Sequence, residues 1–259
     1  MTAAPIVQVG GVAQRFGRRM IFRDVSFSVA AGEVFVILGG SGSGKSTLLN
    51  QLIGLLPPTK GDIDIASHRI TGPQGAAGRE AARHSFGVMF QSGALFGSMT
   101  LLQNVMLPLE MFTELPPDGC EAVARVKLGL VGLGHAAGLL PAEISGGMAK
   151  RAGIARAMAL DPPLLFLDEP SAGLDPITSA GLDRLILDLR ADLGATFVVV
   201  THELASILTI ADRCVMLDAR AYRDAGGLIA EGDPKALRAT STDPRVHAFF
   251  NREILEAAA

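Results

Sequence analysis

One glycine-rich segment, GGSGSGKS at residues 39–46, constrains the fold of this chain more than any other feature. It follows an apolar run at residues 34–38 and leads into a helical pattern at residues 47–53, so the order is strand, glycine loop, helix. A glycine, four free positions and then Gly-Lys-Ser is the pattern of a phosphate-binding loop. The alternative is an ordinary glycine-rich turn, but the strand before it and the helix after it favour the phosphate loop.

The residue types of this loop suit the binding of phosphate groups. Glycines let the backbone turn its N–H groups inward to form a concave anion nest, and the following helix adds its own free N–H groups. Lys45 can reach the β- and γ-phosphates, and the Ser46 hydroxyl can bind Mg²⁺. The residues predicted to bind the nucleotide here are Gly39, Gly40, Ser41, Gly42, Ser43, Gly44, Lys45, Ser46 and Thr47.

Composition narrows the class of protein. The chain has 259 residues and a net charge of −3, which suits one large α/β domain or a domain with an insertion and gives no basic footprint for nucleic acid. Cys120 and Cys214 lack metal-ligand spacing, so we expect buried free thiols in a reducing compartment. Residues 1–5 do not resemble a signal peptide, and no apolar run approaches the about 20 residues of a membrane span.

The hydrophobic pattern predicts a division of the chain. Alternating residues at 6–9 and 21–29 predict an antiparallel layer before the buried strand at 34–38, and further strands are predicted at 63–65, 86–90, 164–167 and 197–200. From residue 92 to about residue 140 the strand pattern stops, and helical periodicity takes over at 105–112 and 121–130, which predicts an inserted, mostly helical sub-domain. We therefore expect a core at 1–91 and 161–240, a helical sub-domain at 92–160 and a tail at 241–259. Residues 214–217 and 228–230 predict a final hairpin, and Asp233 and Asp243, each followed by a proline, predict the starts of two further helices. Residues 71–85 receive no assignment.

Polar residues follow two of the predicted strands. Asp168 and Glu169 come directly after the apolar run at 164–167, where Asp168 is placed to hold Mg²⁺ with Ser46 and Glu169 to orient or deprotonate a water. A solvated strand end is the alternative. His202 follows the strand at 197–200, and beside the two carboxylates it becomes a candidate contact to the γ-phosphate.

Two further motifs are ambiguous on their own. Ser145, Gly146 and Gly147 open a helical pattern, which fits either an anion site or an ordinary N-cap and turn. Phe16 fits either a core aromatic or a platform for an adenine ring, and spacing alone favours the core.

Taken together and in this order, these motifs resemble the nucleotide-binding subunit of an ABC transporter over almost the whole chain. The resemblance implies a P-loop NTPase core of RecA-like fold with an antiparallel β layer and an inserted helical sub-domain. It implies that ATP and Mg²⁺ bind between two copies arranged head to tail, with Ser145, Gly146 and Gly147 of one copy facing the phosphate loop of the other. Phe16 becomes the adenine platform, Gln91 a sensor of the γ-phosphate and Mg²⁺, and Asp175 part of the dimer interface.

One position departs from the family pattern, because Met148 stands where the family usually has Gln after Ser-Gly-Gly. A thioether cannot donate the hydrogen bonds of an amide. That methionine and the segments at 90–96, 175–178 and 243–246 resemble the ATPase of MCE-associated, Mla-type lipid transporters. The resemblance implies phospholipid transport between bacterial envelope membranes at the cytoplasmic face of the inner membrane. Its implied partners are an integral permease, an MCE-type substrate-binding protein and a small regulatory subunit.

Two other functions remain as alternatives. A non-transport ABC-type ATPase acting on ribosomes or DNA usually has two nucleotide domains in one chain or a long coiled-coil insertion, and neither is visible here. A regulatory nucleotide-binding module without turnover is disfavoured by Glu169. The expected reaction is therefore ATP hydrolysis coupled to transport, with Glu169, His202 and Lys45 as its catalytic residues.

Overall fold

The computed structural model describes residues 5–253 of the chain. They form two compact units: unit 1 comprises residues 5–83 and 198–253, and unit 2 comprises His84–Phe197. Strand β8 (Thr196–Val200) contains the second boundary between them. The predicted division at residues 92 and 160 differs from these boundaries and stays a prediction about functional sub-domains.

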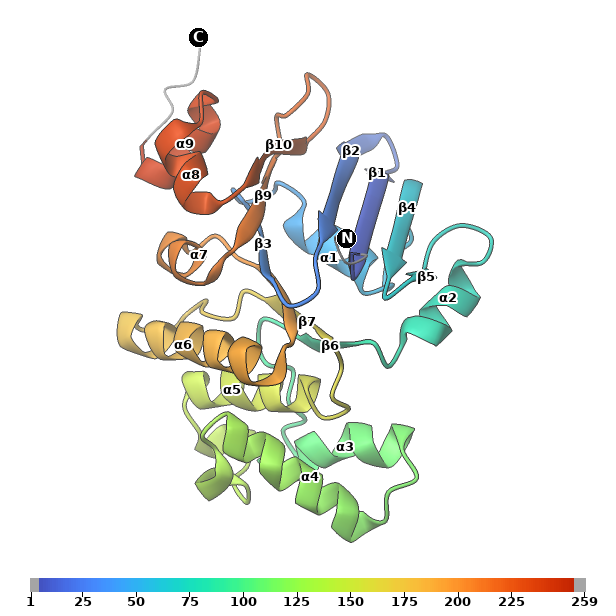
Figure 1. The fold of residues 1–259 in the computed structure, drawn as a ribbon, viewed down its shortest axis with the longest axis vertical. Coiled ribbons are helices and arrows are strands. Elements are labelled where there is room, and N and C mark those ends of the chain that lie inside the picture. The colour runs from blue at the N-terminus through green and yellow to red at the C-terminus, as the bar shows by residue number, and fades with distance from the viewer. Residues whose placement is uncertain (1–4, 254–259) are drawn as a thin grey trace. The chain divides into compact units, whose positions relative to one another are not determined.

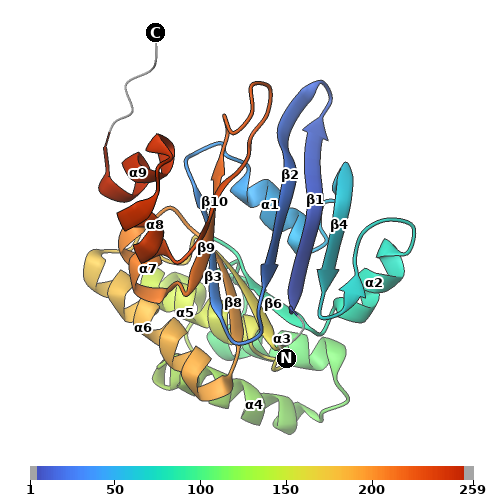
Figure 2. The ribbon, with the colours of Figure 1, turned by 45° about the horizontal axis from the view of Figure 1, so that its top comes forward.

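Unit 1 opens with an antiparallel sheet. Its strands are β1 (Val7–Phe16), β2 (Arg19–Val29), β4 (Lys60–Ile65) and the short β5 (His68–Arg69), in the order β2-β1-β4-β5. Figure 2 shows β2, β1 and β4 side by side. The alternation of apolar and polar residues in β2 buries Val25, Phe27 and Val29. The predicted antiparallel layer is therefore confirmed.

The central strand of unit 1 is β3 (Val34–Gly39), and every one of its residues is buried. It pairs in parallel with β9 (Arg213–Asp218), which pairs antiparallel with β10 (Gly227–Gly232), so the predicted final hairpin is confirmed. The chain leaves β3 through the glycine loop and enters α1 (Lys45–Leu52). This arrangement places the glycine loop at the carboxyl end of a buried parallel strand, where open α/β sheets bind their ligands.

Four more helices belong to unit 1 (Figure 1): α2 (Gly75–Ala82), α7 (Leu204–Ile210), α8 (Pro234–Thr240) and α9 (Pro244–Asn251). Asp233 and Asp243 cap α8 and α9, and a proline follows each cap as predicted. Helix α2 lies in the segment that received no assignment. The last six residues of the predicted tail, 254–259, lie outside the described residues.

Unit 2 combines two parallel strands with a helical part. Strand β6 (Phe86–Met89) pairs in parallel with β7 (Leu164–Asp168), and both strands lie where the apolar runs predicted them. The helices are α3 (Leu101–Phe112), α4 (Pro117–Leu130), α5 (Gly146–Ala157) and α6 (Pro176–Leu193), with short 3₁₀ turns η1 (Gly134–Ala136) and η2 (Pro141–Glu143). Helices α3, α4 and α5 pack on one another (Figure 1). Among residues 5–253, no helix is both long and apolar enough to span a bilayer.

Helix α3 begins four residues earlier than the predicted start at residue 105. The reason is a capping box, in which the Thr100 side chain accepts from the Gln103 N–H and the Gln103 side chain accepts from the Thr100 N–H. Helix α5 likewise begins at Gly146 because the Ser145 hydroxyl accepts from the Met148 N–H. Helix starts depend on these local bonds, which periodicity alone does not reveal.

Candidate functional site

The glycine loop of unit 1 has a backbone path that only glycine permits at two positions. Gly39 has a φ of 152°, and a Cβ there would lie 2.2 Å from the carbonyl oxygen of Leu217 in β9. Gly44 caps α1 with a φ of 98°, and a Cβ there would lie 2.7 Å from the ring of Phe22. The loop is therefore packed tightly between its own strand, the neighbouring β9 and β2 of the antiparallel sheet.

Lys45 folds back over this loop. Its ammonium donates to the carbonyl oxygens of Gly39 at 2.8 Å and of Gly40 at 3.2 Å. The Ser43 hydroxyl is buried and has no hydrogen-bond partner among the residues that the structure describes. A cavity of about 230 Å³ lies over the loop, lined by Arg19, Ile21 and the loop residues Gly42, Ser43, Gly44, Lys45, Ser46 and Thr47. The loop thus has a cation, hydroxyls and helix N–H groups of the kind that bind anions, and its contacts to a nucleotide stay a prediction.

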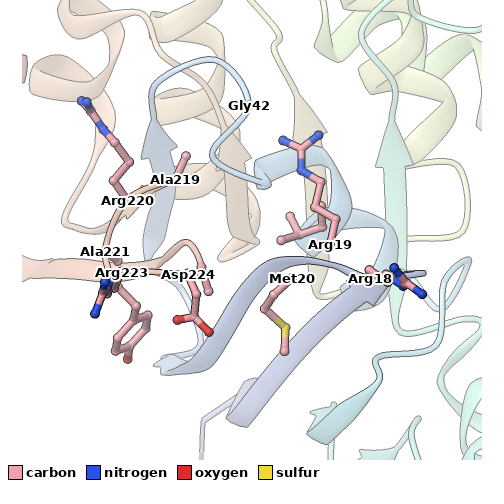
Figure 3. Close-up of a pocket in the computed structure, with 12 residues that line it drawn as sticks. Arg18, Arg19, Met20, Gly42, Ala219, Arg220, Ala221, Arg223 and Asp224 are labelled. Atoms are coloured by element: carbon pink, nitrogen blue, oxygen red, sulfur yellow. The ribbon is translucent and has the colours of Figure 1, made fainter.

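Arg19 is a candidate binding residue that the sequence analysis missed. It begins β2, is exposed, and makes no ion pair within residues 5–253. It lines the cavity over the loop and a second cavity of about 650 Å³ on the same side of unit 1, whose wall also contains Arg18, Arg220 and Arg223. In Figure 3 the Arg19 side chain extends toward the loop that carries Gly42, whereas Arg18 points away. The cluster of arginines makes this side of the loop attractive to anions.

Two other predicted residues also lie in unit 1. Phe16 is the last residue of β1 and is 49% exposed. Its interpretation as a core aromatic is therefore wrong, and its ring is accessible for stacking. His202 follows β8, and its Nε2 atom lies 3.8 Å from a carboxylate oxygen of Glu203. The stacking of Phe16 on an adenine ring and the contact of His202 with a γ-phosphate both stay predictions.

The two carboxylates lie in unit 2 at the end of β7, where the sequence placed them. Asp168 is the last residue of the strand, and Glu169 follows with a positive φ of 46°. The left-handed conformation costs a residue other than glycine roughly 1–2 kcal/mol. Strain of this kind gathers at functional sites, where the surrounding structure holds it in place.

Gln91 and Glu169 are linked through a residue that the sequence analysis left without a role. Lys150 in α5 is buried, and its ammonium donates to the backbone carbonyls of both Gln91 and Glu169. Burial lowers the pKa of Lys150, and the negative charges of Asp168 and Glu169 oppose that shift. No sequence pattern pairs Lys150 with these carbonyls, because they lie 59 and 19 residues away along the chain.

The Ser-Gly-Gly motif also belongs to unit 2. Ser145 and Gly146 are exposed at the start of α5, whereas Gly147 is buried, and a Cβ on Gly147 would lie 2.5 Å from the Thr178 side chain in α6. Asp175 caps α6 by accepting from the Ile177 and Thr178 N–H groups, both at 3.0 Å. The hydrogen bond from the Thr178 hydroxyl is the largest cause of a lowered pKa for Asp175. Because the Ser145 hydroxyl accepts from the Met148 N–H, its interpretation as an N-cap is confirmed. An anion site at the same helix start stays a prediction.

The structure thus groups the predicted residues by unit. Unit 1 holds the phosphate loop with Phe16 and His202, together with Arg19. Unit 2 holds Gln91, the Ser-Gly-Gly motif, Asp168, Glu169 and Asp175, together with Lys150. Among the described residues, no group of three or more His, Cys, Asp or Glu side chains is arranged to hold a metal by itself.

Comparisons with known proteins agree with this geometry. The family model of the ABC transporter matches residues 22–172. The chain is 43% identical over 245 residues to mkl of Mycobacterium tuberculosis, described as a "probable ribonucleotide transport ATP-binding protein", and spans 66% of that relative's length. It is 40% identical over 251 residues to the intermembrane phospholipid transport system ATP-binding protein MlaF of Escherichia coli, and spans 90% of its length. It is 41% identical over 233 residues to the methionine import ATP-binding protein MetN of Brucella abortus, and spans 61% of its length.

Solved structures show the same fold. The cbiO1 protein of Clostridium perfringens, part of an ABC transporter complex, matches with a TM-score of 0.81 at 28% identity, covering 92% of both chains. A dimeric post-hydrolysis state of the ATP-binding cassette MJ0796, bound to ADP and Pi, matches with a TM-score of 0.76 at 29% identity, covering 88% of this chain and 98% of that one. With the phosphate loop at the end of β3, the carboxylates at the end of β7 and these matches, the chain belongs to the ABC transporter family and has the fold of its ATP-binding subunits.

Proposed function

We propose that this chain is the ATP-hydrolysing motor subunit of an ABC transporter that moves phospholipid or a related lipid between bacterial envelope membranes. The observation that carries the proposal is the joint presence of a complete phosphate loop and of Asp168 and Glu169 at the end of a buried strand. The lipid substrate rests on the similarity to MlaF, of which the chain covers 90%, and on the segments around Gln91, Met148 and Asp243. This chain spans a smaller share of the relatives named for ribonucleotide and methionine transport, 66% and 61% of their lengths.

ATP is held through its phosphates. The N–H groups of the phosphate loop and the ammonium of Lys45 bind the β- and γ-phosphates, and Arg19 adds a second cation on the exposed side. The half-exposed ring of Phe16 stacks on the adenine. In this arrangement the negative charge of the nucleotide is matched by groups that are already in place, which lowers the cost of ordering them.

Glu169 orients and deprotonates the attacking water, and Lys45 with His202 stabilises the charge that develops on the γ-phosphoryl group. The oxygen donors of Ser46, Gln91 and Asp168 are of the kind that Mg²⁺ prefers, and these residues would hold it. When bound, Mg²⁺ neutralises charge on the β- and γ-phosphates. The reaction converts ATP and water to ADP and phosphate.

Two copies of the chain complete the reaction site. Ser145 and Gly146 are exposed at the start of α5, and they face the nucleotide of a second copy in the head-to-tail arrangement. Ile177 beside Asp175 is 85% exposed, which suits a residue that a second copy covers. The matched MJ0796 structures are dimeric and one holds ADP and Pi, in agreement with this arrangement.

Transport requires a membrane partner. Phe96, Met111, Phe112 and Leu115, in α3 and the segments on either side of it, are 40–64% exposed, and exposed apolar side chains of this kind suit a docking surface. We assign this surface to an integral permease, which would hold the chain at the cytoplasmic face of the inner membrane. An MCE-type substrate-binding protein and a small regulatory subunit complete the proposed complex.

The substitution Glu169→Gln tests the reaction. It keeps the size of the side chain but removes the base, so ATP should still bind, hydrolysis should fall more than about 100-fold, and a closed dimer should accumulate. Normal turnover in that variant would remove Glu169 from the mechanism.

The lipid is tested separately. The complex is purified in detergent from its own membranes, and co-eluting small molecules are identified by mass spectrometry. A phospholipid at a fixed ratio to the complex supports the proposal. Recovery of a nucleotide or an amino acid as the transported substrate, or of ribosomes instead of a permease, would overturn it.

A further inference from the structure

Lys150 joins two segments that the proposed reaction uses, through hydrogen bonds to a backbone carbonyl of each. It lies in the second turn of α5, and only 6% of the residue is exposed. Its ammonium donates to the carbonyl oxygen of Gln91 and, at 3.0 Å, to that of Glu169. A buried ammonium is held where its protons find acceptors, so these two carbonyls fix its position and it fixes theirs.

The link to Glu169 matters because the backbone of that residue is strained. Its φ of 46° lies in the left-handed region, which a residue with a side chain adopts only where the surroundings hold it. The carbonyl oxygen of Glu169 accepts from the Ala172 N–H at 3.2 Å and from Lys150 at 3.0 Å. Of these two bonds, the one from Lys150 is charge-assisted and therefore the stronger.

The link to Gln91 is reinforced by the next turn of the same helix. Arg156 donates to the carbonyl oxygens of Ala94 at 2.7 Å and of Gly93 at 3.1 Å. Between the two cations, Gly153 lets the loop approach, since a Cβ there would lie 3.2 Å from the Gly93 Cα atom. Helix α5 therefore holds the loop that begins at Gln91 by three bonded carbonyls and a close backbone contact.

We propose that Lys150 is a positioning residue for ATP hydrolysis, which holds the backbone of Glu169 in its strained conformation and ties it to the loop that begins at Gln91. This inference rests on the proposed function for the role of Glu169 as the base. The hydrogen bonds from Lys150 to the carbonyls of Gln91 and Glu169 do not depend on that function. A displacement of the loop at Gln91 would pull on the same ammonium that holds Glu169. The orientation of the base is thus coupled to a loop on which a partner can act.

The experiment compares Lys150→Met and Lys150→Arg in the full chain. Methionine keeps an unbranched side chain of similar length but cannot donate, whereas arginine keeps the donors. We expect Lys150→Met to raise amide hydrogen exchange at least about 10-fold in peptides covering residues 90–96 and 168–174, because both lose a bonded carbonyl. It should lower kcat at least about 10-fold and leave the ATP dissociation constant within about 3-fold, because the phosphate loop keeps its own contacts. In Lys150→Arg, the exchange rates and kcat should return most of the way to their wild-type values.

Lys127→Met is the matched control. Lys127 is also a buried lysine of unit 2, at 5% exposed, but it pairs with Asp161 and, within residues 5–253, donates no hydrogen bond to either segment. Its substitution should leave exchange at residues 90–96 and 168–174 unchanged.

Unchanged exchange in folded Lys150→Met would overturn the proposal, as would equal exchange in both methionine variants or a failure of arginine to rescue. If the wild-type chain hydrolyses no ATP, the proposed function fails while the exchange comparison still decides the link. Should Lys150→Met not fold, Lys150→Leu, whose shorter side chain also cannot donate, takes its place with the same expected outcomes.

Discussion

The side-chain ammonium of Lys45 lies 2.8 Å from the carbonyl oxygen of Gly39, six residues earlier in the same loop. It also donates to Gly40, so the lysine braces the loop from within. When a nucleotide is bound, its phosphate oxygens can accept hydrogen bonds from this ammonium, and they carry more negative charge than a carbonyl oxygen does.

The substitution Lys45→Ala should therefore weaken ATP binding far more than it weakens the fold. Loss of charge-assisted bonds to phosphate is expected to raise the ATP dissociation constant at least about 10-fold. The stability of unit 1 should fall by only about 1 kcal/mol, because the two carbonyls can turn to water. Isothermal titration calorimetry and urea unfolding measure the two effects. Wild-type affinity for ATP in this variant would contradict the assignment of the loop.

The glycines of the loop are expected to differ sharply in their tolerance of a methyl group. A Cβ on Gly39 would lie 2.2 Å from the Leu217 carbonyl oxygen and would face a left-handed backbone, so Gly39→Ala should destabilise the chain by about 2–4 kcal/mol. Gly40 has no atom within 4 Å of the same position, so Gly40→Ala is the matched control and should change stability by less than about 1 kcal/mol. Equal urea midpoints for the two variants would show that β9 does not restrain the loop.

Cys214 should be chemically inert in the folded chain. Burial in β9 raises the pKa of its thiol from 9.0 to about 12, and the charges of Asp233 and Glu231 add to the effect while Arg213 opposes it. The thiolate is the nucleophile, so iodoacetamide at pH 9 should modify Cys214 more than about 100-fold more slowly in the native chain than in urea. Mass spectrometry of the peptide gives both rates. Rapid native labelling would show that this strand opens.

The same raised pKa makes a prediction about pH. A folded pKa above the unfolded value of 9.0 means that the stabilisation is complete below pH 9 and is lost as pH rises toward 12. Cys214→Ala should therefore flatten the alkaline fall in urea midpoint over that window.

The start of α9 depends on a carboxylate that the sequence marked only as a cap. Asp243 accepts from the Arg245 backbone N–H at 2.8 Å, and its carboxylate also binds the Arg245 guanidinium at 3.0 and 2.6 Å. The hydrogen bond from the Arg245 side chain is the main cause of a pKa for Asp243 below its usual 3.8. The bond therefore stabilises the fold above pH 3.8 and is lost as pH falls below that value.

Asp243→Asn should lower the urea midpoint at pH 7 but make progressively less difference as the pH falls below 4, because the wild-type carboxylate then becomes protonated too. Asparagine still caps a helix, so the variant removes the ion pair and keeps the cap. Asp233→Asn at the start of α8 is the control, since Asp233 caps its helix by the Lys235 N–H at 2.8 Å without a comparable side-chain bond from Lys235. A gap between wild type and Asp243→Asn that stayed constant from pH 7 to pH 3 would contradict the role of the ion pair.

Several features of the candidate site could be predicted from sequence because each one is local. The phosphate loop, the carboxylates after β7 and the Ser145 cap depend on residues a few positions apart, where backbone geometry and residue type decide the outcome. Phe16 shows the limit of this reasoning. Its burial depends on what surrounds the end of the β1–β2 hairpin, so the core interpretation from spacing failed.

The sequence by itself determined the family and the position of the glycine loop between β3 and α1, and it predicted most of the strands and helices, because these follow from short patterns and their spacing. Only the tertiary structure decided that Lys150 binds the carbonyls of Gln91 and Glu169, that Arg19 lines the cavity over the phosphate loop, and that Leu217 limits position 39. The physical reason is distance along the chain. Backbone carbonyls carry no residue-specific signal, and a lysine that bonds to them 19 or 59 positions away is identified only when packing brings the segments together.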